Sequence, residues 1–262
     1  MVRKFLISRI LWLMPKRTLT SLVGWFCHTR ASALCIPLFS YCYKIPLEQA
    51  QYPYRHYPSL TAFFSRRLKP SLRVMPTDER AVVSPVDGVV SSIGIIHQGL
   101  LVQVKGVEFT VKDLLDRAMY DDDFEGGTYV IIYLSPQDYH RIHAPLTAMV
   151  VSQTRIGGML FPVNRLGLYT IDSLYTKNER LVCSMVQDAY RFSLIAVGST
   201  LVGSVKLSPA LDGKQEIIVT QGDELGWFEF GSTVILLFAK GQVELSLQKG
   251  QRIEALQQIG TW

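Results

Sequence analysis

Two histidines three residues apart are the most chemically capable pair of side chains in this sequence. His140 and His143 lie within residues 133–145, YLSPQDYHRIHAP, and are two of only five histidines in the chain. Residues 135–138 are typical of a helix start, and the helical turn that follows would place both imidazoles on one face. Such a pair could act as acid and base or bind one metal ion, but it could equally be a buried, hydrogen-bonded pair.

A carboxylate that could serve one of these histidines is Asp87, within residues 84–90, SPVDGVV. Asp87-Gly88 is typical of a turn that leads into a strand. A carboxylate there could hold a histidine in one tautomer and stabilise its imidazolium. Taken alone, however, an aspartate in a turn more often bonds its own backbone.

The tripeptide Gly-Ser-Thr occurs twice, at residues 198–200 and 231–233. The second copy leads directly into the apolar run VILLF of residues 234–238, which is typical of a buried strand. Ser232 would be held rigidly at the mouth of that strand, and Gly231 before it would leave its carbonyl open to attack. The tripeptide itself does not distinguish Ser232 from Ser199.

Basic charge is concentrated in one part of the chain. The 262 residues carry a net charge of +5, with 48% hydrophobic and 19% charged residues, which is typical of a globular protein. Residues 1–44 hold seven basic residues and no acid, so the remainder has 27 − 7 = 20 basic and 22 acidic residues. This asymmetry argues against a nucleic-acid-binding protein. Four cysteines without a C-x-x-C pair argue against a disulfide framework or a zinc knuckle.

The basic N-terminal segment also carries large apolar side chains. Its longest uncharged stretch, residues 31–43, has 13 residues and contains Pro37, whereas a membrane span needs about 20 apolar residues. Basic amphipathic helices with Trp and Phe suit the headgroup region of an anionic bilayer. We therefore expect residues 1–52 to be a helical membrane-association segment; the alternative is a helical cap packed on the rest of the protein.

The remainder of the chain has a sequence pattern typical of a β-rich domain. A short helix is expected over residues 60–68 and another over 111–119, capped by Thr110. Nine short apolar runs separated by turn residues predict strands: 88–96, 100–105, 128–134, 149–154, 180–186, 192–197, 216–220, 233–238 and 243–247. The predicted fold class is α+β, with a β-rich sandwich or barrel-like catalytic domain over residues 53–262 and amphipathic helices before it.

The ordered set of motifs resembles the phosphatidylserine decarboxylase family. It runs over essentially the whole chain: FFSRRLKP at 63–70, PVDG at 85–88, KG at 105–106, residues 133–143, LFPVN at 160–164, NER at 178–180 and FGST at 230–233. The family's cleavage motif is usually Leu-Gly-Ser-Thr, and here Phe230 replaces the leucine. The stretch around Ser199 resembles an uncleaved family strand, Val-Gly-Ala-x-x-Val-Gly-Ser. The resemblance therefore assigns cleavage to the bond between Gly231 and Ser232.

The resemblance implies a self-made cofactor. His143, oriented by Asp87, would deprotonate Ser232, whose oxygen attacks the Gly231 carbonyl and shifts the chain from an amide to an ester. Elimination would leave dehydroalanine, and its hydrolysis would give ammonia and a pyruvoyl group. The products would be a large chain, residues 1–231, and a small pyruvoyl chain, residues 232–262.

The resemblance also implies the reaction. The pyruvoyl ketone would form a Schiff base with the amine of phosphatidylserine and accept electrons as carbon dioxide leaves. His140 matches a second functional histidine of the family and is our candidate for the acid that protonates the carbanion. Hydrolysis would release phosphatidylethanolamine, with no metal or nucleotide required.

Partners and location follow from the same reading. We expect phosphatidylserine, an anionic membrane surface and a heterodimer of the two cleavage chains, with further dimerisation left open, and no nucleic acid. The expected location is peripheral, on the cytoplasmic face of the bacterial cell membrane. The alternatives are a Ser-His-Asp hydrolase, disfavoured because the G-x-S-x-G motif is absent, a metallohydrolase using His140 and His143, and a non-enzymatic membrane-docked β-sandwich carrier or scaffold. A family variant acting on a soluble amino acid is disfavoured by the basic, apolar N-terminus.

Overall fold

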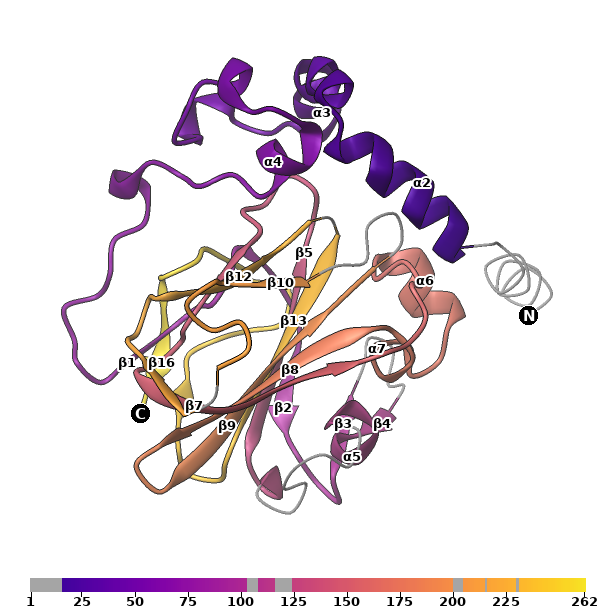
Figure 1. Cartoon of the computed structure of the whole chain (residues 1–262). Coiled ribbons are helices and arrows are strands. Elements are labelled where there is room, and N and C mark those ends of the chain that lie inside the picture. The colour runs from indigo at the N-terminus through magenta and orange to yellow at the C-terminus, as the bar shows by residue number, and fades with distance from the viewer. Residues whose placement is uncertain (1–15, 103–107, 116–123, 200–204, 215, 230) are drawn as a thin grey trace.

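Antiparallel strands are the main regular elements of the computed structural model, which describes residues 16–102, 108–115, 124–199, 205–214, 216–229 and 231–262 (Figure 1). The strands are β1 (Ala81–Val83), β2 (Gly88–Ile95), β3 (Leu100–Val102), β4 (Glu108–Thr110), β5 (Thr128–Leu134), β6 (Arg141–His143), β7 (Ala148–Ile156), β8 (Arg180–Gln187), β9 (Tyr190–Val197), β10 (Val205–Leu207), β11 (Ile217–Val219), β12 (Glu224–Phe228), β13 (Ser232–Phe238), β14 (Glu244–Leu245), β15 (Arg252–Ile253) and β16 (Gln258–Thr261). The α-helices are α2 (Lys16–His28), α3 (Ile36–Tyr43), α4 (Leu60–Phe64), α5 (Val111–Leu115), α6 (Arg165–Thr170) and α7 (Leu174–Lys177).

One eight-stranded sheet organises the molecule, with strand order β11-β7-β8-β9-β13-β5-β2-β15. Two three-stranded sheets, β10-β12-β6 and β1-β16-β14, accompany it. β13 lies between β9 and β5 and pairs with both in antiparallel register. All seven of its residues are buried, which explains why its sequence is a continuous apolar run and does not alternate.

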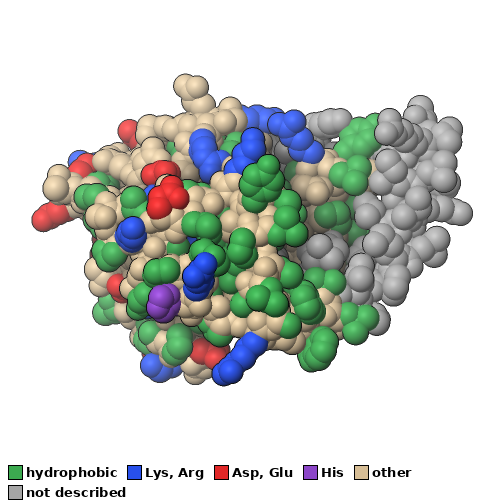
Figure 2. All heavy atoms as spheres, turned by 90° about the horizontal axis from the view of Figure 1, so that it is seen from above, with side chains coloured by type: hydrophobic (Ala, Val, Ile, Leu, Met, Phe, Trp, Pro, Cys, Tyr) green, Lys and Arg blue, Asp and Glu red, His purple; other side chains and the backbone are tan. Residues whose placement is uncertain are grey.

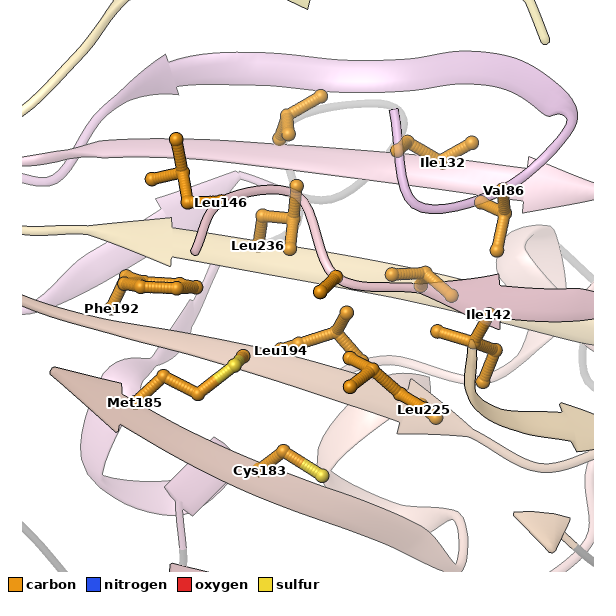
Figure 3. Close-up of a cluster of buried hydrophobic side chains, with 14 of the residues drawn as sticks. Val86, Ile132, Ile142, Leu146, Cys183, Met185, Phe192, Leu194, Leu225 and Leu236 are labelled. Atoms are coloured by element: carbon orange, nitrogen blue, oxygen red, sulfur yellow. The ribbon is translucent and has the colours of Figure 1, made fainter. Parts of the chain in front are cut away.

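The large sheet is covered on both faces. One face packs on the small sheets through a cluster that includes Ile142, Leu225, Leu236 and Ile259; Figure 3 shows side chains of this cluster converging from several strands. The other face packs on β3, β4 and helices α5 to α7 through a second cluster, whose fully buried side chains include Phe161. The predicted α+β class with a β-rich sandwich core is confirmed.

The N-terminal helices form a separate layer beyond one end of the strands (Figure 1). α2, α3 and the 3-10 helix between them (Arg30–Cys35) pack on α4 through a small apolar cluster that includes Cys27, Ile36 and Phe63. Among the described residues, no single helix is long and apolar enough to cross a bilayer. Ser21–His28 and Arg30–Tyr43 reach the necessary length only together, with an 85° bend between them.

The predicted strands are confirmed, because all nine apolar runs contain a strand. Residues 103–105, at the end of the second run, and residues 116–119 of the predicted second helix lie outside the described residues. The cap of that helix is confirmed, since the Asp113 amide donates to the Thr110 hydroxyl at 2.9 Å. The helix predicted over 60–68 ends at Phe64, because the following residues pair with an earlier segment, through a bridge between Ala50 and Leu68.

Candidate active site

Both histidines lie in the segment that follows β5 and runs to the end of β6. This segment is a turn followed by a strand. The Asp138 carboxylate accepts hydrogen bonds from the Ser135 amide and hydroxyl, both at 2.7 Å, which closes the turn. β6 then pairs with β12, which is remote in sequence. The predicted helical turn is therefore wrong: the Asp138-closed turn and strand pairing satisfy the backbone instead. In extended backbone, residues three apart point to opposite sides, so His140 and His143 have different surroundings.

His140 is completely buried and has one bonded nitrogen. Nδ1 lies 2.8 Å from the Asp138 carbonyl and must donate to it, whereas Nε2 has no partner among the described residues. The Phe64 ring lies against the imidazole, with 4.0 Å between ring centroids. Burial lowers the pKa of His140 to about 3; the Asp138 carbonyl opposes this shift and the Arg66 charge adds to it. His140 is thus neutral, with an Nε2 lone pair that has no partner among the described residues.

His143 is also held as a neutral base. Nδ1 donates to the Gly222 carbonyl at 2.8 Å, so Nε2 accepts from the Tyr139 hydroxyl at 3.1 Å. Burial lowers the pKa of His143, while the Gly222 carbonyl and the Glu224 charge oppose the shift. The basic nitrogen is therefore covered by a phenol, which must move aside before His143 can take a proton from another group.

Asp87 lies close to His143 but is bonded to other groups. The His143 amide donates to the Pro85 carbonyl at 2.9 Å, which brings the histidine to the loop that carries Asp87. The Asp87 carboxylate pairs with Arg73 at 2.6 Å and accepts from the Ala255 amide at 2.7 Å. The structure thus places Asp87 where its charge acts on His143, without a direct hydrogen bond between them.

Ser232 is the first residue of β13, opposite Leu134 in β5. Its side chain is completely buried, and its Oγ has no hydrogen-bond partner among the described residues. The Phe228 amide donates to the His140 carbonyl at 2.9 Å. Ser232 therefore lies only four residues along the chain from a residue that is hydrogen-bonded to His140. Phe230, which occupies the family's leucine position, lies outside the described residues.

The second Gly-Ser-Thr serine lies beside the first. Ser199 follows β9, whose last residue, Val197, pairs with Thr233. The Ser199 Oγ accepts a hydrogen bond from the Val163 amide at 3.3 Å. A methyl group placed on Gly231 would lie 3.7 Å from both Cβ and Oγ of Ser199. The two serines are therefore neighbours, and within the described part of the chain a hydrogen bond reaches the Ser199 hydroxyl but not that of Ser232.

A cavity of about 910 Å³ is lined mainly by β2 and α6. Its walls include Tyr133, the cross-strand partner of Thr233, and Val163, whose amide is bonded to Ser199. Most of the remaining lining comes from apolar side chains of β2 and α6, with Arg165 and Lys249 as charged members. The cavity provides apolar space beside Tyr133, whose cross-strand partner Thr233 follows Ser232 in β13.

Three groups of this region were not singled out by sequence reasoning: Arg73, Tyr139 and Arg66. Arg73 neutralises Asp87, Tyr139 covers His143, and Arg66 lies buried beside the segment that carries His140. Tyr139 and Arg66 do belong to the quoted motifs, but nothing in their spacing indicates a partner. Among the described residues, no group of three or more His, Cys, Asp or Glu side chains is arranged to hold a metal ion.

Comparisons with known proteins give one consistent result. A family model described as phosphatidylserine decarboxylase matches residues 60–261. The chain is 38% identical to a phosphatidylserine decarboxylase proenzyme of Brevibacillus brevis, with 98% of each chain covered. It is 37% identical to the proenzyme of Myxococcus xanthus, with 96% of each covered. It is 34% identical to that of Salmonella arizonae, over 94% of this chain and 83% of the other.

Proposed function

Because the chain belongs to the phosphatidylserine decarboxylase family, whose proenzymes are pyruvoyl-dependent, we propose that Ser232 becomes the pyruvoyl group and that cleavage separates residues 1–231 from 232–262. The enzyme converts phosphatidylserine to phosphatidylethanolamine. One observation carries the assignment of Ser232: its hydroxyl is fully buried at the mouth of the central strand without a partner among the described residues, whereas the neighbouring Ser199 is hydrogen-bonded.

In the cleavage step, His143 is the base. Its neutral Nε2 takes the proton of Ser232 once the Tyr139 phenol moves aside, and the Ser232 oxygen attacks the Gly231 carbonyl. The negative charge of Asp87 stabilises the imidazolium that forms, without a direct bond. A depressed pKa keeps this base in its reactive form at neutral pH.

In the decarboxylation step, His140 moves the proton. A pyruvoyl group, when present, supplies the electron sink that stabilises the carbanion left by carbon dioxide. The anionic headgroup of a bound substrate raises the pKa of His140, so that its bare Nε2 takes a proton from the substrate ammonium, which frees the amine to react, and returns a proton to the α-carbon afterwards. The sequence suggested an acid here; the donation by Nδ1 to Asp138 supports a base first and an acid second.

The two pieces stay together as a heterodimer after cleavage. The small piece begins with β13, whose residues pair with β9 on one side and β5 on the other, both in the large piece. Its apolar side chains lie in both clusters that cover the large sheet. Separation would expose this strand to water, so we expect dissociation only under denaturing conditions.

Intact-mass spectrometry tests the assignment of Ser232. Wild-type protein should give two masses, that of residues 1–231 and that of residues 232–262 with serine replaced by a pyruvoyl group. Ser232→Ala protein should give one mass, that of the full chain. A full-length wild-type chain that nonetheless decarboxylates phosphatidylserine would contradict the assignment.

The N-terminal segment holds the enzyme on anionic membrane surfaces. Trp25, Leu34 and Leu38 expose 71%, 85% and 66% of their surface on α2, the following 3-10 helix and α3. Figure 2 looks onto this end of the molecule and shows hydrophobic side chains gathered among Lys and Arg side chains. With seven basic residues and no acid in residues 1–44, this surface suits a bilayer containing phosphatidylserine. The location proposed is the cytoplasmic face of the bacterial cell membrane.

The membrane segment, residues 1–52, and the catalytic domain, residues 53–262, therefore differ in function but share an apolar cluster. Cys27 and Ile36 pack against Leu60 and Phe63 across that boundary. Deleting the segment would expose those side chains, so surface substitutions test it more cleanly than truncation.

Vesicle co-sedimentation of a triple variant tests the membrane surface. Replacing Trp25, Leu34 and Leu38 by serine should weaken binding to phosphatidylserine vesicles about tenfold or more, because each side chain loses apolar burial in the bilayer. Added salt should weaken wild-type binding without abolishing it. The control replaces Val74 and Ile218, 77% and 76% exposed elsewhere, and should bind as wild type does. Equal binding by the triple variant and wild type would show that the helices only cap the fold.

A further inference from the structure

Arg66 is a buried guanidinium with most of its donors unused. The residue follows α4 and exposes only 3% of its surface. Nη2 donates to the Gln137 carbonyl at 3.3 Å, and the guanidinium lies 5.1 Å from the centre of the Phe63 ring. Nε and Nη1 have no hydrogen-bond partner among the described residues. Burying charged donors in this way is costly unless something else binds them.

Arg66 also forms no ion pair with any described residue. Asp87 and Asp138 are the carboxylates whose charges act on it, but each forms an ion pair with another arginine, Arg73 and Arg252 respectively. Burial lowers the pKa of Arg66 to about 10, so it stays charged at neutral pH. We call this buried charge, which has no ion pair of its own among the described residues, the surplus cation.

The surplus charge lies in the region of the proposed active site. Arg66 bonds Gln137, three residues before His140, and its charge acts on that imidazole. The Nε2 of His140 and the Oγ of Ser232 are likewise buried and without partners among the described residues. Donors, a base and a nucleophile without partners at one end of the sheet indicate a site built for an anionic ligand.

We propose that Arg66 binds the phosphodiester of the phosphatidylserine headgroup; the inference rests on the proposed placement of the active site at His140 and Ser232. The planar guanidinium directs its N–H groups in a fork that matches the oxygens of a phosphate. The headgroup carries a phosphate, a carboxylate and an ammonium group, with a net charge of −1, which the surplus cation balances.

Decarboxylation chemistry favours the phosphate over the carboxylate as the group that Arg66 binds. The carboxylate leaves as neutral carbon dioxide, so a cation bound to it would stabilise the substrate more than the transition state and slow the reaction. The phosphodiester keeps its charge from substrate to product. Arg66 can therefore hold the headgroup in place without opposing the loss of carbon dioxide.

Kinetics of Arg66→Met provide the first test. Methionine preserves much of the apolar stem and removes the charge. With cleavage verified by intact mass, KM for phosphatidylserine in mixed micelles should rise about 10- to 100-fold, as expected for losing a charge-assisted contact, while kcat changes only a few-fold. The matched control is Arg67→Met, since Arg67 is exposed and pairs with Glu224; its KM should stay at the wild-type value. An unchanged KM for Arg66→Met overturns the proposal.

A binding test in the Ser232→Ala background does not depend on cleavage. Glycerophosphoethanolamine, which has the phosphodiester but no carboxylate, should raise the melting temperature of Ser232→Ala protein and not that of Ser232→Ala/Arg66→Met. L-serine, which has the carboxylate but no phosphate, should affect both alike. Loss of the L-serine effect alone would assign Arg66 to the carboxylate and overturn the proposal, as would equal protection of both proteins by glycerophosphoethanolamine.

Stability without ligand separates a binding role from a structural one. Removing an unpaired buried charge should leave the melting temperature of the Ser232→Ala background unchanged or higher. A drop of several degrees would show that Arg66 is retained for the fold and would count against the proposal. Failure of the underlying site assignment is distinguishable, because Ser232→Ala protein would then be cleaved and active whatever residue stands at 66.

Discussion

The two Gly-Ser-Thr copies have the same sequence and lie side by side, yet their serines have opposite surroundings. Ser199 follows the last residues of β9, and its hydroxyl accepts a hydrogen bond from the Val163 amide. Ser232 begins the antiparallel neighbour, β13, and its hydroxyl is buried with no partner among the described residues. Because the tripeptide is shared, any difference in reactivity between the two serines must come from their surroundings.

Burying a hydroxyl without a hydrogen bond is unfavourable. A precursor can still retain such a group where it is needed as a nucleophile. Leaving a buried donor unsatisfied costs about 1–3 kcal/mol. Ser199 accepts a hydrogen bond from the Val163 amide, so its oxygen satisfies a buried donor and the side chain has a structural role. In the proposed cleavage, Ser232 has no bond to another described residue to break before it attacks the Gly231 carbonyl, so less reorganisation is needed on the way to reaction.

Exchanging each serine for alanine gives the largest expected effect. Ser232→Ala should abolish both cleavage and decarboxylation, because it removes the nucleophile and the source of the pyruvoyl group. Ser199→Ala should cleave to completion, because the hydroxyl it removes is engaged with Val163. Gel electrophoresis and intact mass separate these results. The comparison fails if Ser199→Ala remains one chain while Ser232→Ala is cut.

The histidines test what makes the environment of Ser232 reactive. His143→Ala should slow cleavage by about 10²- to 10⁴-fold, the usual contribution of a general base. His140→Ala should allow cleavage but lower the decarboxylation rate by a similar factor, because its Nε2 is assigned to proton transfer with the substrate and not to the cleavage step. Time courses of precursor disappearance, followed by assays of the cleaved protein, measure the two steps separately. Equal cleavage by His143→Ala and wild type would remove this histidine from the mechanism.

The pH dependence of cleavage tests the buried surroundings of His143, and the expected effect is smaller. Burial lowers the pKa of His143 below its usual 6.5, so the neutral base persists as the pH falls through that value. The cleavage rate of freshly refolded precursor should therefore be constant from pH 8 to 6.5 and decline only in more acidic solution. A rate that has already halved at pH 6.5 would indicate an ordinary, solvent-exposed histidine.

Local sequence predicted the strands well because their signal is local. The run that forms β13 is apolar at every position, and both of its faces are buried, so continuous hydrophobicity and burial agree. Turn residues bounded the other runs in the same way. The position of Ser232 at the mouth of a buried strand followed directly from this pattern.

The partners of the site residues could not be predicted because they come from remote segments. The helical turn expected for His140 and His143 is replaced by a strand that pairs with β12, about 80 residues later. Asp87 resembled a partner for histidine, yet its bonded partners are Arg73 and the Ala255 amide. Spacing along the chain carries no information on such contacts, which depend on which strands lie side by side.

The smallest expected effect concerns stability, and it asks whether the Ser199 hydroxyl is structural. In the uncleaved Ser232→Ala background, Ser199→Ala leaves the buried Val163 amide without its acceptor. We expect the free energy of unfolding to fall by about 1–3 kcal/mol, the cost of one unsatisfied buried donor. Urea unfolding of the single and double variants measures the difference. Thr233→Val is a suitable comparison on the adjacent strand, since it exchanges a hydroxyl for a methyl group at a fully buried position of β13. If Ser199→Ala leaves stability unchanged, its bond to Val163 does not distinguish the two serines, and the reactivity of Ser232 must come from His143 alone.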